Sequence, residues 1–197
     1  MKQQPEKNQS QTIEEQKQLA SQWFMQLRDT ICAEFETLET ELKDSDQPAG
    51  TFESEQWNRP GGGGGEMSIM KGRVFEKVGV NISKVHGQFS DMFRSQIPGT
   101  EDSGDFWASG ISLVAHMCSP LVPAVHMNTR FIVTGKSWFG GGADLTPMFE
   151  NEDDTQRFHA AFKNTCDDYD PEYYPKFKQQ CDDYFYLPHR QEPRGIG

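Results

Sequence analysis

The chain has 197 residues, with 30 acidic against 19 basic side chains and a formal net charge of -11 at pH 7. This length suits one domain of ordinary size or part of a larger one. The acidic balance, without any run of Lys or Arg, argues against nucleic acid and against an anionic membrane surface as partners. The most apolar window, residues 111–127, is interrupted by polar residues and prolines, so no membrane span is expected.

The amino-terminal residues and the cysteines indicate in which cellular compartment the protein is expected. The first eleven residues, MKQQPEKNQSQ, contain no apolar signal core. No CxxC spacing occurs among Cys32, Cys118, Cys166 and Cys181. Both features favour the reducing cytoplasm. Residues 1–11 are polar and rich in Gln, and are predicted to form a disordered tail, which leaves residues 12–197 as a single domain.

The next segments are a helix and a glycine run. Apolar residues recur at intervals of three and four between Ala20 and Leu42, which predicts a long amphipathic helix packed by one face. Five consecutive glycines, Gly61 to Gly65, predict a loop whose backbone amides are able to wrap an anion. A nucleotide site is not expected, because the phosphate-binding pattern that ends at Ser137 requires a glycine where Arg130 stands.

The stretch from Ile111 to Phe149 begins with two extended runs separated by the turn-prone sequence CSPLVP. Successive side chains of an extended chain point to opposite faces. If the two runs pair, five polar groups converge on one sheet surface, which suits an anionic, carboxylate-bearing ligand. The alternative is the solvated face of an antiparallel sheet. The five groups belong to Ser112, His116, His126, Asn128 and Arg130.

The remaining elements are predicted from pattern. Residues 73–86 are expected to form one or two strands, residues 89–104 a polar loop, and residues 138–147 a turn-rich loop. An acidic first turn at residues 151–154 starts a helix, and a second, aromatic helix follows over residues 172–187. The buried stripe of the first of these helices is predicted to contain Phe158, Phe162, Thr165, Cys166 and Tyr169.

Four histidines lie in segments otherwise rich in core residues: His116, His126, His159 and His189. A metal site is one interpretation, and it would fit a metal-dependent hydrolase, although no pair has the short helical spacing of zinc ligands. Proton handling near neutral pH is the other.

Several long motifs, in order, resemble the oxygen-dependent coproporphyrinogen III oxidases: VFEKVGVNISKVHG, SLVAH, HMNTRF, WFGGGADLTP, YYPKFKQQCDDYFYLPHR and RGIG. The resemblance covers residues 20–197. It implies an α+β fold in which a large antiparallel β-sheet is flanked by α-helices on both faces, assembled as a homodimer. It also implies the oxidative decarboxylation of two propionate groups of coproporphyrinogen III to vinyl groups, giving protoporphyrinogen IX in porphyrin and haem biosynthesis. Molecular oxygen is then the co-substrate, and no organic cofactor is needed.

The same resemblance assigns roles to individual residues. His126 is the implied proton donor. The implied substrate-binding residues are Ser112, Asn128, Thr129 and Arg130. In bacterial members a divalent metal cation is held at the positions of His116, His126, His159 and His189.

Members of this family continue past the RGIG motif, through a segment with an Asp and an Arg implicated in catalysis. The chain is therefore interpreted as the amino-terminal two thirds of such an enzyme, as a fragment or a truncated product. By itself it is expected to be inactive or prone to aggregation, because an open sheet edge would remain. The alternative is a non-catalytic remnant that still binds a tetrapyrrole.

Overall fold

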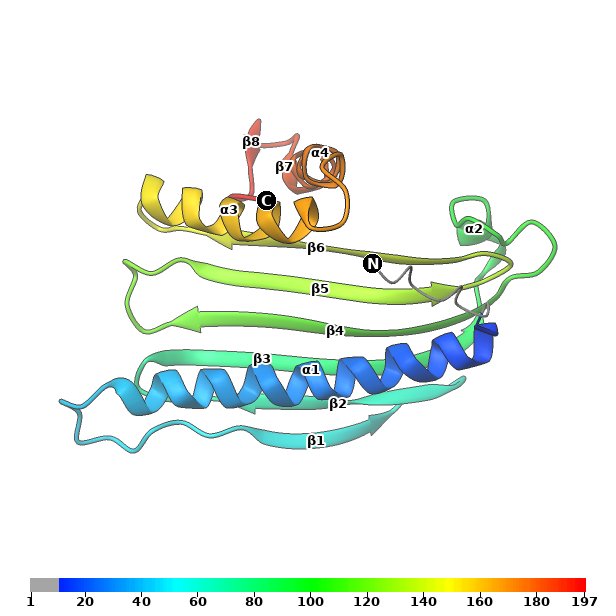
Figure 1. Cartoon of the computed structure of the whole chain (residues 1–197). Helices are drawn as coiled ribbons and strands as arrows, with labels where there is room; N and C mark the ends of the chain where they lie inside the picture. Colours follow the sequence, from blue (N-terminus) through cyan, green and yellow to red (C-terminus); the bar gives the residue numbers. More distant parts are fainter. Residues whose placement is uncertain (1–10) are drawn as a thin grey trace, which may run out of the picture.

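The computed structural model describes residues 11–197, and its centre is a six-stranded antiparallel sheet whose strands follow one another in chain order (Figure 1). The strands of this sheet are β1 (Glu53–Asn58), β2 (Gly63–Met70), β3 (Phe75–Gln88), β4 (Asp105–Met117), β5 (Ala124–Val133) and β6 (Ser137–Thr146). The helices are α1 (Ile13–Glu41), α2 (Asp91–Arg94), α3 (Glu152–Asp167) and α4 (Tyr173–Phe185). A small hairpin of β7 (Tyr186–Leu187) and β8 (Glu192–Pro193) follows α4. The predicted α+β class is confirmed. The tail predicted over residues 1–11 lies, apart from Gln11, outside the described residues.

Helix α1 begins at Ile13, seven residues before the predicted start. Thr12 caps it: the Thr12 hydroxyl accepts a hydrogen bond from the Glu15 backbone N–H, and the Glu15 carboxylate accepts one from the Thr12 backbone N–H. This reciprocal arrangement satisfies amides that the first turn would otherwise leave free. The prediction started at Ala20 because the first two turns of the helix bury little apolar surface.

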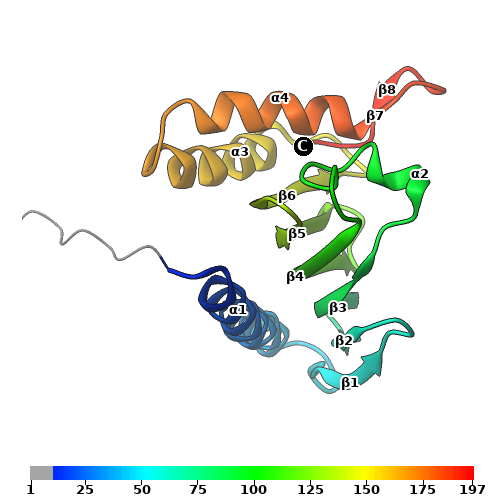
Figure 2. The ribbon, with the colours of Figure 1, turned by 90° about the vertical axis from the view of Figure 1, so that its right-hand side faces the viewer.

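The core lies between α1 and the sheet face beneath it, called the inner face here. Figure 2 shows α1 on one side of the sheet. Ala20 and Phe24 of α1 pack with buried strand residues, namely Met70, Val78, Val80, Ile111, Leu113, Ala115 and Phe131. The predicted alternation along β4 is confirmed, because Ile111, Leu113 and Ala115 are buried and the residues between them are not. Polar groups are thereby directed to the opposite, outer face.

Helices α3 and α4 lie beyond the β6 edge of the sheet (Figures 1 and 2). The carboxy-terminal end of α4 reaches the outer face, where Phe185 packs against the His126 ring. Helices therefore lie on both faces of the sheet as predicted, with α1 on the inner face and the end of α4 on the outer face over β5 and β6. The predicted buried stripe of α3 is wrong, because no residue of α3 is buried and Tyr169 beyond its end is 83% exposed. Helix α3 packs chiefly on α4, which leaves most of its surface free.

The glycine run is not a single loop. Gly61 and Gly62 make the turn between β1 and β2 with φ angles of 97° and 127°, which favour glycine. The run then continues into β2, where Gly65 pairs with Trp57 of β1. A Cβ atom on Gly64 would lie 2.2 Å from the Trp57 carbonyl oxygen, so close strand pairing explains this glycine. The loop prediction was therefore wrong for the second half of the run.

The segment predicted as a turn-rich loop at residues 138–147 is instead strand β6. It forms a hairpin with β5, and its three central glycines face Asn128, Thr129 and Arg130 in the register. A Cβ atom on Gly141 would lie 2.2 Å from the Asn128 carbonyl oxygen. Glycine runs are typical of turns, and for this reason the sequence predicted a loop. In the structure these glycines allow the backbones of β5 and β6 to pair closely.

A buried carboxylate ties the end of α1 to the start of β3. Glu39 is fully buried, and its two oxygens accept four backbone N–H groups at 2.9 to 3.1 Å, from Gly50, Arg73, Val74 and Phe75. Burial raises the pKa of this carboxyl, but the four N–H donors outweigh burial and hold the pKa below its ordinary value. Glu39 thus fixes the position of α1 on the sheet.

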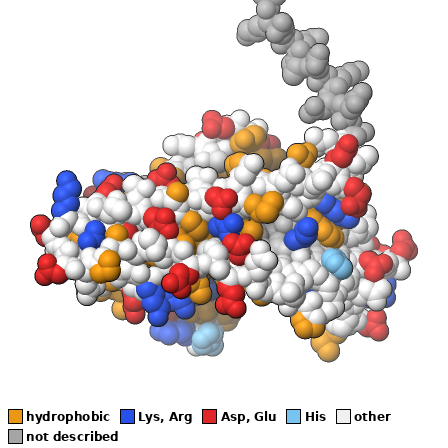
Figure 3. All heavy atoms as spheres, turned by 90° about the horizontal axis from the view of Figure 1, so that it is seen from below, with side chains coloured by type: hydrophobic (Ala, Val, Ile, Leu, Met, Phe, Trp, Pro, Cys, Tyr) orange, Lys and Arg blue, Asp and Glu red, His pale blue; other side chains and the backbone are white. Residues whose placement is uncertain are grey.

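Charged side chains of both signs cover the exterior at the β1 edge. Seen from the β1 edge, Lys and Arg side chains are interspersed with Asp and Glu (Figure 3). Within residues 11–197, none of the helices combines the length and the apolar character that crossing a bilayer would require.

Candidate functional site

The outer face of β4, β5 and β6 collects the polar side chains that the sequence singled out. His126 of β5 lies opposite Val114 of β4, and Asn128 lies opposite Ser112. Side chains that are directly opposite on neighbouring strands have Cβ atoms about 4.5–5.5 Å apart. Ser112, His126, Asn128 and Arg130 therefore share one surface. His116 lies on the same face, two residues beyond Val114.

His126 is held by a buried carboxylate from the neighbouring strand. Asp144 of β6 pairs with His126 in the register and is only 1% exposed. Its Oδ1 lies 2.8 Å from His126 Nδ1, and the Asn128 amide nitrogen lies 3.2 Å from His126 Nε2. A ring that carries its hydrogen on Nδ1 donates it to the carboxylate, and in this tautomer Nε2 accepts from the Asn128 amide. The ring is oriented at both nitrogens, as proton transfer requires.

Arg194 completes this cluster from the far end of the chain. Its Nη2 lies 3.2 and 3.3 Å from the two oxygens of Asp144, and its guanidinium lies 4.5 Å from the centre of the Phe185 ring. Two backbone hydrogen bonds between Leu145 and Ile196 bring the segment that holds Arg194 alongside β6. Phe185 contacts both His126 and Arg194, so it excludes water from one side of the cluster.

Arg130 is exposed and has room to move toward a ligand. Its register partners are Gly110 on β4 and Gly140 on β6, so neither directly opposite residue places a side chain beside it. A guanidinium in this position, near an amide and the Ser112 hydroxyl, suits a carboxylate. Thr129 is different: it pairs with Ile111 and Gly141 and points to the inner face, away from the other predicted substrate-binding residues.

The structure does not gather the four histidines predicted for a metal. They come from β4, β5, α3 and the turn between β7 and β8. Within residues 11–197 there is no group of three or more His, Cys, Asp or Glu side chains that could hold a metal ion. Burial and the nearby Lys178 ammonium lower the pKa of His159, with Asp182 acting in the opposite direction. The described residues therefore do not fit the divalent cation that the resemblance implies.

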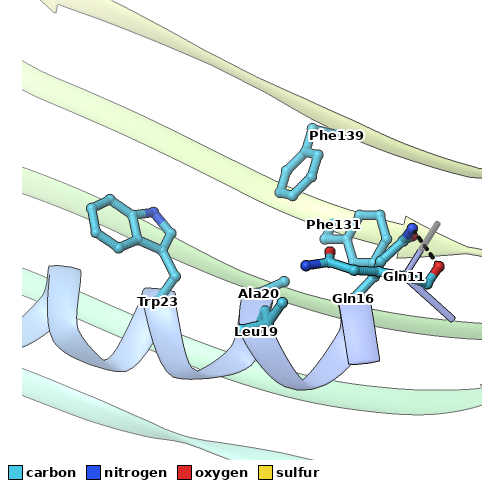
Figure 4. Close-up of a pocket in the computed structure, with 7 residues that line it drawn as sticks. All are labelled: Gln11, Gln16, Leu19, Ala20, Trp23, Phe131 and Phe139. Carbon is cyan, nitrogen blue, oxygen red and sulfur yellow. Dashed lines mark hydrogen bonds between the residues drawn. The ribbon is translucent and has the colours of Figure 1, made fainter. Parts of the chain in front are cut away.

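A cavity of about 490 Å³ lies elsewhere, between α1 and the inner face of β5 and β6 (Figure 4). Its walls are mainly apolar, from Leu19, Ala20 and Trp23 of α1 and from Phe131 and Phe139 of the sheet. Gln16 donates a hydrogen bond to the Gln11 carbonyl at its rim. Phe131 and Phe139 point to the inner face, so the sheet separates this cavity from His126.

Two members of the cluster, Asp144 and Arg194, were missed by the sequence interpretation. Asp144 lay in the segment taken for a loop. If the segment is interpreted as the second strand of a hairpin that turns at Gly135, residue 144 lies opposite residue 126. The sequence alone could therefore have placed Asp144 beside His126. Arg194 had no such signal, because its position depends on how the last residues return to the sheet.

Comparison with known proteins identifies a family. The coproporphyrinogen III oxidase family profile matches residues 19–197. The oxygen-dependent coproporphyrinogen-III oxidase of Rickettsia bellii strain RML369-C is 60% identical over 182 residues, which are 92% of this chain and 65% of that protein. The enzyme of the same name from Rickettsia felis is 63% identical over 185 residues, 93% of this chain and 66% of that protein. The one from Rickettsia akari is 62% identical with the same coverage. The chain thus spans slightly less than two thirds of these relatives.

Proposed function

This chain belongs to the coproporphyrinogen III oxidase family, and from that premise we propose that its outer face binds coproporphyrinogen III for oxygen-dependent decarboxylation. One observation carries the proposal. An imidazole oriented by a buried carboxylate, His126 with Asp144, lies on the same face as the Arg130 guanidinium. Proton handling and carboxylate binding are the two tasks that this reaction sets for the protein.

The chemistry of each turnover defines these tasks. The bond between a propionate carboxylate and its chain breaks, carbon dioxide leaves, and the carbon next to the ring loses a hydrogen with two electrons, which yields a vinyl group. Oxygen takes up that hydrogen with its electrons and one further proton to give hydrogen peroxide. The macrocycle is electron-rich, so the protein mainly has to orient the propionate and manage protons.

Each residue of the site has a part in this proposal. Arg130 and Asn128 donate hydrogen bonds to the propionate carboxylate, and Ser112 helps to set its orientation. His126 holds or delivers a proton at Nε2, the ring nitrogen that Asp144 leaves available. Arg194 neutralises Asp144 and keeps it in place, so that the carboxylate remains directed at Nδ1.

The activity is tested with coproporphyrinogen III under air and under argon. Because the chain spans less than two thirds of its relatives, two proteins are assayed: this chain, and a chimera that adds the part of the Rickettsia felis protein which the chain does not cover. We expect the chimera to form protoporphyrinogen IX in air only, and the chain alone to be inactive. Product formation by the chimera under argon would exclude an oxygen-dependent reaction. A chimera that is folded but inactive in air would favour a non-catalytic tetrapyrrole-binding protein.

Replacing Arg130 by Ala is expected to weaken tetrapyrrole binding. A charge-assisted hydrogen bond is worth about 1.5–3 kcal/mol, so the dissociation constant should rise by about ten- to a hundredfold. Binding is measured by fluorescence titration of the chain with coproporphyrin III, the air-stable oxidised form that retains the propionates. The exposed Arg157 of α3 supplies the charge-matched control, since Arg157→Ala should leave the constant unchanged. Equal affinities for Arg130→Ala and wild type would remove Arg130 from the site.

We also propose that the protein works in the cytoplasm, as part of a homodimer. The four free cysteines, without a disulfide among them, support a reducing compartment. The homodimer rests on the family resemblance. Light scattering of the chimera measures the mass of the assembly directly, and a monomer would contradict the proposed dimer.

A further inference from the structure

Two rows of residues cross the outer face from β3 to β6. In one row, Asn81 of β3 lies opposite Ser112, which lies opposite Asn128. In the next row, Gly79 of β3 lies opposite Val114, which lies opposite His126. The polar surface described above therefore continues onto β3, where the sequence interpretation had placed no functional residue.

Gly79 has no structural reason to be glycine within the described residues. Its φ angle is not in the left-handed region, and a Cβ atom built on it would meet only the Asn81 side-chain nitrogen, at 3.7 Å. By contrast, a Cβ atom on Gly110 or Gly141 would lie 2.6 or 2.2 Å from a backbone oxygen of β5. A glycine inside a strand costs stability and often marks a place where a ligand approaches the backbone closely.

Gly140 repeats this feature at the opposite corner of the surface. It lies opposite Arg130, and a Cβ atom on it would come no closer than 3.8 Å to the Trp138 ring. Nearby, α4 forms a wall: the Cys181 sulfur lies 3.5 Å from the Cβ position of Gly142. At Gly79 and Gly140 no side chain rises from the sheet, so the surface is recessed there. Between these two glycines it is polar, and α4 bounds it at the β6 edge.

We infer that the tetrapyrrole-binding surface extends to β3, where Gly79 leaves clearance for the macrocycle and Asn81 donates a hydrogen bond to one of its carboxylates. The inference rests on the proposed function and adds two recognition residues to it. Asn81 is exposed and carries an amide that is able to donate without adding charge. A side chain at residue 79 would stand in the space above the row that holds His126.

The test is a fluorescence titration of the 197-residue chain with coproporphyrin III, in wild type, Gly79→Ala, Gly79→Leu, Asn81→Ala and Asn81→Asp. Displacement by coproporphyrinogen III under argon verifies that the porphyrin occupies the substrate surface. Gln56→Leu is the matched control, because it adds an exposed leucine to β1, at a register position opposite Glu66 on the inner face. Thermal unfolding of every variant is followed in parallel.

We expect Gly79→Leu to raise the dissociation constant by about tenfold or more through a steric clash with the ligand. Its melting temperature should be equal to or above that of wild type, because a Cβ atom at residue 79 meets only the Asn81 side-chain nitrogen, at 3.7 Å, and a glycine inside a strand costs stability. Gly79→Ala should show a smaller loss of affinity. Asn81→Ala should weaken binding by about tenfold and Asn81→Asp further still, because the new carboxylate repels the ligand. Gln56→Leu should bind as wild type does.

The two proposals fail differently. The proposed function stands if wild type binds coproporphyrin III and Arg130→Ala binds it more weakly. If, in the same experiment, either Gly79→Leu or Asn81→Asp binds like wild type, the extension to β3 is overturned. If wild type does not bind coproporphyrin III, both are overturned. Loss of binding by Gly79→Leu together with a lower melting temperature would show that the glycine is structural, and this also overturns the inference.

Discussion

The Asp144→Asn variant of the chimera is expected to lose oxidase activity by about a hundredfold or more, the range over which general acid–base catalysis acts. Asp144 lies between two donors, His126 Nδ1 and Arg194 Nη2. An asparagine side chain has one acceptor oxygen, so its NH₂ group must face one of these donors. If the NH₂ group faces His126, the imidazole loses the acceptor at Nδ1 and must change its tautomer. If it faces Arg194, the ion pair that keeps residue 144 directed at His126 is lost.

This variant should change turnover more than binding. Asp144 is 1% exposed, so we expect it to act by positioning His126 and to have no contact with the substrate. The rate constant kcat is therefore expected to fall while KM, and the affinity of the 197-residue chain for coproporphyrin III, change by less than about threefold. Equal losses in kcat and in porphyrin affinity would indicate that the substitution had simply disrupted the site. Asp102→Asn, at an exposed position, is the matched control.

Removing the Glu39 carboxylate is expected to have the largest effect on stability. Glu39→Ala leaves four backbone N–H groups without their acceptor, in a place that is closed to water. An unsatisfied buried donor costs about 1–3 kcal/mol, so the free energy of unfolding should fall by about 3 kcal/mol or more. Denaturant unfolding of the 197-residue chain measures the loss. Glu41→Gln, at the exposed end of α1, should be close to neutral.

The Glu39 effect also predicts a dependence on pH. The pKa of this carboxyl is lower in the folded protein than its ordinary value of 4.5. Its contribution to stability is therefore complete above the unfolded pKa and disappears as the pH falls through the folded pKa. The difference in unfolding free energy between wild type and Glu39→Gln should be largest at neutral pH and narrow below about pH 4.5. A difference that stays constant down to acidic pH would contradict the assignment.

Much of the site was accessible from sequence because it depends on local periodicity. Alternation along two neighbouring runs placed Ser112 and His126 on one face, and the antiparallel register confirmed it. The same alternation, applied without the resemblance, places Thr129 on the inner face, apart from these residues. Asp144 was missed because its glycine-rich segment resembled a turn, whereas those glycines allow β6 to pair closely with β5.

What the sequence by itself determined is the set of elements whose pattern repeats: the amphipathic α1, the alternating strands β4 and β5, and membership of the family through long ordered motifs. Tertiary structure alone decided that Arg194 meets Asp144, that Phe185 closes over His126, and that the four histidines stay apart. Periodicity reports which side of its own element a residue faces, because backbone geometry repeats every few residues. It does not report which distant segment comes to lie beside that residue, because that choice belongs to the packing of the whole chain.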